Sequence, residues 1–148
     1  MHNTLSASNY SLLNEDDFTP KPSYWGALLW RRLMGKRVLD LGMTNRLGLH
    51  VYAHCLRGTP GGVAMLVINN DRQTPSTVAL PLPCARFTLA TSDPTHRSIT
   101  LNGMPLQLGA GDALPVMNGE QVAAGELSFA PATITFLAIP AAQNDGCR

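Results

Sequence analysis

NYSLLNEDDFTPKPSYWGALLWRRLMGK, residues 9–36, is the stretch that decides how the rest of the chain can fold. Its second half predicts a helix, with Ser23 as the N-cap and Gly35 just past the last turn. A helix end rich in Arg and Lys suits the helix dipole. Apolar side chains recur every three or four positions and so share one stripe, which predicts that the helix packs against a large apolar surface. These side chains are Tyr24, Trp25, Leu28, Leu29, Leu33 and Met34.

Composition excludes several classes of function. With 148 residues, the chain is long enough to form a domain with a core of its own. Charged residues make up 14% and the formal net charge is +1, which argues against nucleic-acid and anionic-membrane binding. The apolar run at residues 63–68 is far too short to span a bilayer, so no transmembrane segment is predicted. Residues 1–20 lack a basic start and an apolar core, so no signal peptide is predicted.

From Val38 onward, the sequence predicts short strands separated by Gly, Pro and Asn. Residues 49–55 alternate between two faces, and residues 63–69 form a nearly continuous apolar strand after a glycine-rich turn. Asn102-Gly103 is a strong hairpin signal. The spacing predicts a mainly β fold, an antiparallel β-sandwich preceded by one amphipathic α-helix. Further strands are predicted at residues 77–82, 86–91, 98–101, 104–108 and 133–139.

Short motifs in the first quarter of the chain resemble those of a known family. They lie at residues 9–10, 12–14, 18–20, 22–24 and 27–35, and looser matches follow at residues 52–55, 66–70, 101–103, 113–115 and 130–140. Together they resemble the C-terminal part of the heparanase-like glycoside hydrolases, family 79. In that family a (β/α)8 barrel ends in such a helix and leads into a β-sandwich. The resemblance therefore implies that residues 1–35 are the last barrel strand, loop and helix, and that residues 36–148 are the sandwich domain.

The resemblance implies the C-terminal part of a retaining glycoside hydrolase acting on β-glucuronides of acidic polysaccharides or proteoglycan glycans. Retention needs two carboxyl groups roughly 5 Å apart. In the family both glutamates lie on earlier barrel strands, so no catalytic residue is assigned here. The sandwich is expected to be structural, and the chain alone inactive. An upstream barrel would bind the glycan and pack on Tyr24, Trp25, Leu28 and Leu29. The family also implies an extracellular or secretory-pathway location.

Three positions take a role from the same resemblance. Tyr10 matches a tyrosine that contacts the uronic-acid sugar, and is the one substrate-binding residue expected. Cys55 and Cys147 match cysteines that form a disulfide in several members. That bridge would close a loop of about 92 residues and stabilise the fold by on the order of 4 kcal/mol. Cys84 would then be free; the alternative is three unpaired thiols in a reducing compartment.

The acidic residues do not predict an active site of their own. Glu15, Asp16 and Asp17 have the carboxyl groups that glycoside hydrolysis uses. Their position just ahead of a helix favours a solvated loop instead. Glu120 and Glu126 lie in a weakly patterned segment with no supporting polar residues.

Metal and cofactor sites are not predicted either. His50 and His54 point to the same side of a strand but lie about 13 Å apart along it, which is too far for one zinc ion. No Cys-x-x-Cys motif, phosphate loop or nucleophile elbow is present. We therefore expect no metal and no cofactor.

Two alternatives to a hydrolase part stay open. An independent β-sandwich that binds carbohydrate would present exposed aromatic rings for stacking on sugars. Tyr52 and a second aromatic side chain exposed on one flat face would favour that interpretation, whereas Phe87, Phe129 and Phe136 are expected in the core. The other alternative is the product of a truncated gene, with no role of its own.

Overall fold

A computed structural model describes residues 5–6, 10–42, 48–91 and 98–148 of the chain. Its described part contains one α-helix, ten strands and two short 3₁₀ turns. The elements in chain order are α1 (Pro22–Leu33), β1 (Met34–Leu39), β2 (Leu49–Leu56), β3 (Val63–Asn69), β4 (Ser76–Leu80), β5 (Cys84–Ala90), β6 (Thr100–Leu101), β7 (Met104–Pro105), η1 (Ala110–Asp112), β8 (Glu120–Val122), β9 (Gly125–Phe129), β10 (Thr133–Ile139) and η2 (Asp145–Cys147).

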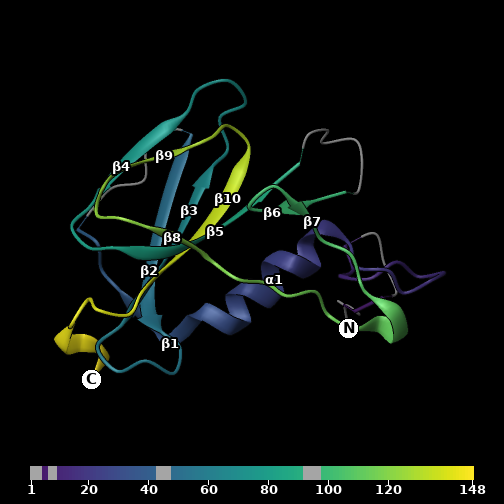
Figure 1. Cartoon of the computed structure of the whole chain (residues 1–148), viewed down its shortest axis with the longest axis horizontal. Coiled ribbons are helices and arrows are strands. Elements are labelled where there is room, and N and C mark those ends of the chain that lie inside the picture. Colours follow the sequence, from purple (N-terminus) through teal and green to yellow (C-terminus); the bar gives the residue numbers. More distant parts are fainter. Residues whose placement is uncertain (1–4, 7–9, 43–47, 92–97) are drawn as a thin grey trace.

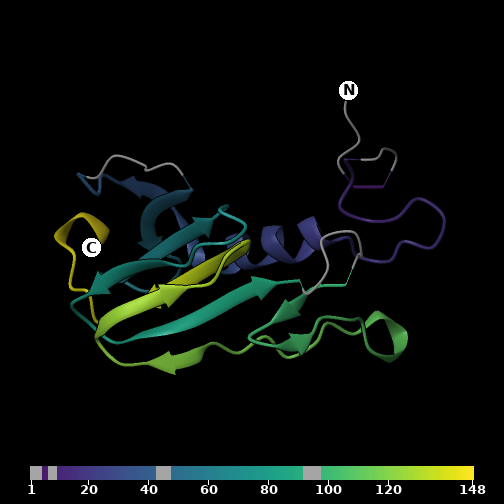
Figure 2. The same ribbon diagram turned by 90° about the horizontal axis from the view of Figure 1, so that it is seen from above.

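The strands form two antiparallel sheets of unequal size. The large sheet has the order β1-β2-β3-β10-β5-β6-β7, and β8 also pairs with β5. The small sheet consists of β4 and β9 (Figure 1). Seen from above, α1 lies to one side of the strands (Figure 2). The predicted fold class, a β-sandwich after one helix, is confirmed.

The large sheet divides the apolar core into two clusters, one under α1 and one under β9. Trp25 of α1 belongs to the first cluster and Phe129 of β9 to the second, and both are almost fully buried. Successive residues of a strand point to opposite faces. On β10, Phe136 accordingly joins the α1 cluster and Leu137 joins the β9 cluster. The central strands are thus covered on both faces, which explains the continuous apolar run at residues 63–69.

The limits of the helix differ from the prediction. α1 begins at Pro22 after Lys21, whose side chain makes no capping hydrogen bond, so Ser23 lies inside the first turn and the N-cap prediction was wrong. Proline suits this first position because its φ is preset and its missing N–H is not needed there. The chain passes directly from Leu33 into β1. Gly35 is therefore a strand residue and not a helix cap; a Cβ there would collide with the carbonyl oxygen of Cys55.

Most predicted strands are present, with shifted ends. The hairpin at Asn102-Gly103 is confirmed: Leu101 pairs with Met104, and the two turn residues have φ of 49° and 82°. The weakly patterned segment that holds Glu120 and Glu126 forms β8 and β9, which join different sheets. No helix among the described residues is long and apolar enough to cross a bilayer.

Candidate functional site

Tyr10 lies on the surface at the N-terminal end of the described chain. Its side chain is 92% exposed. The neighbouring Ser11 is buried, accepts a hydrogen bond from Lys21 Nζ at 2.9 Å and donates one to the carbonyl oxygen of Leu13 at 2.7 Å. The backbone is thus fixed at Ser11, while the adjacent Tyr10 side chain remains exposed and accessible to a partner or ligand. Asn9, the other half of the Asn-Tyr motif, lies outside the described residues.

The acidic cluster ahead of α1 stabilises a turn. Asp17 Oδ1 accepts hydrogen bonds from the backbone N–H of Thr19 at 2.9 Å and from its hydroxyl at 2.7 Å. The backbone bond, followed by the hydroxyl bond, lowers the pKa of Asp17, because both favour the ionised carboxylate. Glu15 and Asp16 are exposed. Since a general acid in glycoside hydrolysis needs a raised pKa, Asp17 is unsuited to that role.

The other two acidic candidates lie on strands of different sheets. Glu120 begins β8, opposite Arg86 of the large sheet, and Glu126 lies on β9, opposite Ala79 of the small sheet. Both are exposed. Neither of them lines the two cavities beside α1 or the one beside η2. They do not form the facing pair that carboxylate catalysis requires.

The two histidines of β2 have separate neighbours. His54 Nδ1 lies 2.7 Å from the carbonyl oxygen of Gly35, and the His54 ring meets Trp30 edge to face at 5.1 Å. His50 Nε2 lies 3.4 Å from Asn70 Nδ2. Within the described ranges, no group of three or more His, Cys, Asp or Glu side chains could hold a metal ion.

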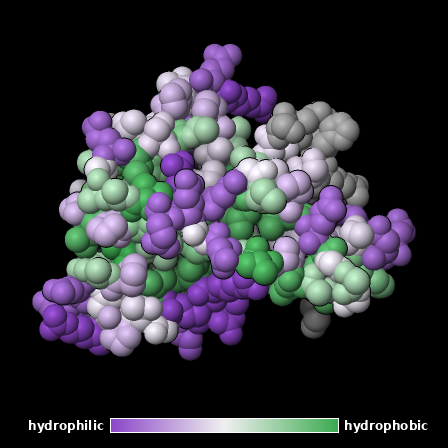
Figure 3. Space-filling view, in the orientation of Figure 1, coloured by the Kyte–Doolittle hydropathy of each residue, from purple (hydrophilic) through white to green (hydrophobic). Residues whose placement is uncertain are grey.

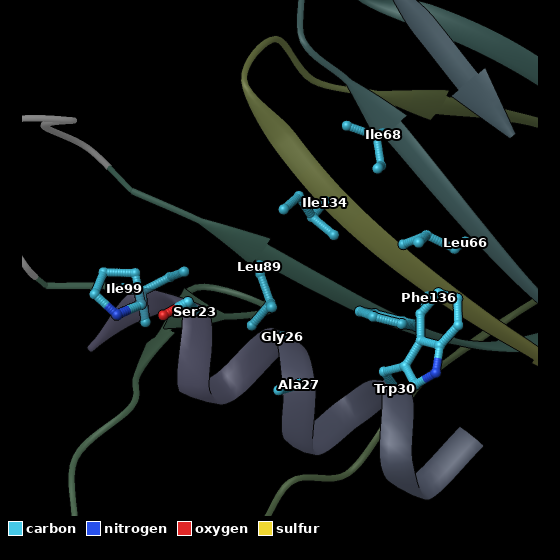
Figure 4. A pocket seen from close by; sticks show the side chains of 11 residues that line it. Ser23, Gly26, Ala27, Trp30, Leu66, Ile68, Leu89, Ile99, Ile134 and Phe136 are labelled. Atoms are coloured by element: carbon cyan, nitrogen blue, oxygen red, sulfur yellow. The ribbon is translucent and has the colours of Figure 1, made fainter. Parts of the chain in front are cut away.

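An apolar groove lies between α1 and the large sheet, and we call it the α1 groove. It has a volume of about 410 Å³. Gly26 faces Leu89 of β5: a Cβ there would lie 3.9 Å from Leu89 Cδ1, an ordinary van der Waals contact. Figure 4 shows Trp30 beside Phe136, with the side chains of β3 and β10 facing α1. The main side chains that line the α1 groove are Trp30, Leu66, Ile68, Leu89, Ile134 and Phe136.

The α1 groove can bind an apolar surface but offers nothing for catalysis. No acidic, basic or histidine side chain lines the part of it that the structure describes, and Ser23 is its one hydroxyl residue. Trp30 is 41% exposed and Ile134 is 39% exposed. Exposed apolar surface of this kind marks interaction sites and ligand-binding grooves.

Ring-bearing side chains continue this surface along β2. Register pairs Tyr52 with Leu66 and His50 with Ile68, so both rings share the face that carries the α1 groove. Tyr52 is 42% exposed. Trp30, His54, Tyr52 and His50 therefore follow one another along this face. We call them the β2 ring row.

The cysteines occupy three different environments. Cys55 and Cys147 form a disulfide with a Cα–Cα distance of 5.3 Å, which ties η2 to the end of β2. Cys84 is a free, buried thiol in the β9 cluster. Burial raises the pKa of Cys84, because the thiolate would lose its hydration. Cys84 is thus a packing residue and not a reactive nucleophile.

The predicted stripe of the helix includes Trp25, with Trp30 as a further apolar flank, and the structure gives the two rings different environments. Trp25 and Leu29 are buried against this chain's own sheet, while Trp30 lines the α1 groove and stays 41% exposed. Five positions at about 100° each place two side chains roughly 140° apart around a helix. That angle was available in the sequence and would have identified Trp30 as the exposed ring.

Comparisons with known proteins relate the chain to glucuronidases and heparanases. It is 32% identical to baicalin-beta-D-glucuronidase of Scutellaria baicalensis over 147 residues, covering 93% of this chain and 27% of that protein. It is 46% identical over 77 residues to heparanase-like protein 1 of Arabidopsis thaliana, covering 52% and 14%. Mouse heparanase is 32% identical over 143 residues, covering 86% and 26%. No family model matches. Where a relative matches most of this chain, the chain spans only about a quarter of that relative's length.

Proposed function

Because the chain is heparanase-like over most of its length, we propose that it is the C-terminal, non-catalytic part of a retaining glycoside hydrolase. The substrates would be β-glucuronides of acidic polysaccharides or proteoglycan glycans. The similarity to a protein named as a β-D-glucuronidase carries this proposal. The catalytic carboxylates would come from an upstream (β/α)8 barrel, and the sandwich would support that barrel.

The α1 side of the sandwich is the proposed support for the barrel. Trp25 and Leu29 already pack on this chain's sheet, so they would hold α1 in place and would not contact the barrel themselves. Tyr24 and Leu28 are partly exposed and could contact the barrel directly. The α1 groove and exposed Trp30 extend the apolar surface beside them. Residues 1–35 would accordingly belong to the barrel, and residues 36–148 to the sandwich.

Tyr10 is the proposed contact with substrate. Its exposed position leaves the phenol free to reach a sugar held by the barrel. We also assign the protein to the secretory pathway, because the disulfide between Cys55 and Cys147 suits an oxidising compartment.

A hydrolysis assay tests the proposal. The purified chain should not hydrolyse a chromogenic aryl β-glucuronide. A chimera should do so, in which this chain replaces the matching 27% of baicalin-beta-D-glucuronidase. Replacing Tyr10 with Phe in the chimera should raise KM more than it lowers kcat. Activity of the chain alone would contradict the proposal, as would a folded but inactive chimera.

A carbohydrate-binding module remains the second candidate, and one observation favours it. Tyr52 and Trp30 are both exposed on the face that carries the β2 ring row. Rings on one face can stack on successive sugars. If the chain binds neutral oligosaccharides and Tyr52→Ala abolishes that binding, the module becomes the better explanation.

A further inference from the structure

A second hollow lies at the N-terminal end of α1, and we call it the hairpin pocket. It is lined by the loop before α1, by α1 itself and by residues 98–112 around β6, β7 and η1. Its volume is about 430 Å³, which lies within the range of roughly 300–1,000 Å³ for ligand sites. Figure 3 shows hydrophilic side chains beside paler ones at the right of the molecule, where η1 and the loop before α1 lie (Figure 1).

The hairpin pocket has an apolar floor and a polar rim. Trp25 is 2% exposed and Leu106 is 8% exposed, and both line the pocket. Gln107 and Asp112 also line it and are exposed. Apolar walls with a few placed polar groups are typical of sites for small ligands. A sugar ring has the matching surface, because its C–H groups form an apolar face and its hydroxyl groups project from the edge.

The charge of the pocket restricts the kind of sugar. Asp112 has the only charged side chain that lines the described part of it. Its carboxylate can accept hydrogen bonds from hydroxyl groups but would repel a uronate or a sulfate. Among the described residues, neither the Gln107 amide nor the Asp112 carboxylate has a hydrogen-bond or ion-pair partner, so both are free to contact a ligand. The pocket therefore suits a neutral sugar.

Hydrogen bonds hold the rim of the pocket in shape. Asn102 Oδ1 accepts from the backbone N–H of Thr88 at 2.7 Å, which ties the β6–β7 turn to β5. Beside η1, the backbone N–H of Gly109 donates to the carbonyl oxygen of Ala113 at 2.7 Å. That bond closes the turn that carries Asp112.

Asp112 has a backbone conformation that side chains rarely adopt. Its φ is 59°, and the preceding Gly111 has a φ of 65°. Glycine would fit this left-handed region without strain, whereas aspartate only tolerates it. Residues held in such conformations cluster at sites that bind ligands. The conformation therefore favours a role for the Asp112 carboxylate beyond reversing the chain.

The hairpin pocket would lie on the catalytic side of the proposed enzyme. In (β/α)8 barrels, active sites are built from the loops that connect each strand to the following helix. If α1 is the last helix of the barrel, the loop before it is such a loop. Thr19 and Pro20 of this loop line the hairpin pocket. Tyr10, the proposed contact with the glucuronide, belongs to the same segment ahead of α1.

We propose that the hairpin pocket binds a neutral sugar of the glycan, next to the glucuronide that the barrel would cleave. This inference rests on the proposed function and adds a part of the substrate that the sandwich itself would recognise. Gln107 and Asp112 would bind the hydroxyl groups of that sugar, while Trp25 and Leu106 would contact its apolar face.

The first test is a titration of the whole chain, followed by nuclear magnetic resonance. The probes are glucose, galactose and mannose as neutral sugars, glucuronic acid as an acidic sugar, and methylammonium as a plain cation. We expect a neutral sugar to bind saturably and to shift the backbone amide signals of Gln107 and Asp112. Glucuronic acid should bind several-fold more weakly, because the Asp112 carboxylate would repel it.

Matched variants identify the site. Gln107→Ala removes the amide, and Asp112→Gly removes the carboxylate while suiting the positive φ. Each should weaken sugar binding by about tenfold, because a hydrogen bond to the ligand is lost. Glu126→Ala removes an exposed carboxylate from β9, and Tyr52→Ala removes an exposed ring from the β2 ring row. Both of these control variants should leave sugar binding unchanged.

Kinetics of the chimera connect the pocket with catalysis. One substrate is the aryl β-glucuronide, which has no neutral sugar, and the other is a β-glucuronide of the neutral sugar that binds best. Asp112→Gly should lower kcat/KM by about tenfold for the second substrate. It should leave kcat/KM for the aryl glucuronide unchanged, because that substrate does not reach the hairpin pocket.

Several results would overturn the assignment. They are no saturable binding of a neutral sugar, methylammonium binding as tight as sugar binding, and equal losses of affinity with Tyr52→Ala and Asp112→Gly. Equal losses of kcat/KM for the two substrates of the chimera would overturn it as well. Because the titration uses this chain alone, its failure leaves the hydrolase proposal standing. An inactive chimera would contradict the hydrolase proposal and would leave the titration result intact.

Discussion

Asn69 connects the two layers of the sandwich at the end of β3. Its side chain is 1% exposed, and Nδ2 lies within hydrogen-bond distance of three carbonyl oxygens: those of Thr74, Phe129 and Ala130. Its Oδ1 accepts from the backbone N–H of Asp71. A buried amide with this many partners fixes how the loop after β3 meets β9.

Asn69→Ala should therefore destabilise the fold by about 2–4 kcal/mol, because it leaves several buried backbone groups unpaired. Urea unfolding measures the loss. Asn70→Ala is the control: Asn70 is exposed, and its side chain has His50 as hydrogen-bond partner among the described residues. Its loss should change stability by less than about 0.5 kcal/mol. Equal losses in both variants would contradict the linking role.

The disulfide between Cys55 and Cys147 is a second local feature that stabilises the fold. Replacing Cys55 and Cys147 with Ser should lower stability by on the order of 4 kcal/mol, because the bridge closes a separation of 92 residues. Cys84→Ala keeps the bridge and tests simple thiol loss from the β9 cluster. If wild type unfolds at the same urea concentration with and without reductant, the bridge does not contribute as proposed. The pairing was suggested by resemblance alone, since three cysteines allow three pairings.

At the scale of the element, α1 has two faces with different partners. The apolar stripe was visible from its spacing, so the helix itself was predictable. Its ends were not, because they depend on tertiary contacts. Gly35 is needed in β1 for close approach to Cys55, and no local signal separates that use from a helix cap.

The two tryptophans of α1 should respond differently to truncation. Trp25→Ala empties a site that is 2% exposed and should cost about 3–5 kcal/mol. Trp30→Ala removes a ring that is 41% exposed and should cost no more than about 1 kcal/mol. Thermal unfolding of both variants measures the difference. Similar losses would mean that Trp30 is also part of the folded core.

At the scale of the whole molecule, the sandwich was predictable and its division into sheets was not. Short strands at regular spacing indicated an antiparallel sandwich. Consecutive strands β8 and β9 nevertheless join different sheets, with only Ala123 and Ala124 between them. The meeting of Lys36 and Arg148 at one surface was equally hidden, because a register shift in β1 and the disulfide bring them there.

The proposed supporting role of the sandwich predicts how the chimera tolerates heat. An acidic side chain in the α1 groove should weaken an apolar contact with the barrel, because its burial would be unfavourable. Thr77→Glu, on an exposed position of β4, makes the same chemical change away from that surface.

The most direct measurement is the temperature at which the chimera loses half of its glucuronidase activity. With Trp30→Glu and Ile134→Glu, that temperature should fall by several degrees, while the isolated variant chain stays folded. Thr77→Glu should leave it unchanged. Equal heat tolerance in all three proteins would contradict the claim that this chain supports a glycosidase barrel through the α1 side.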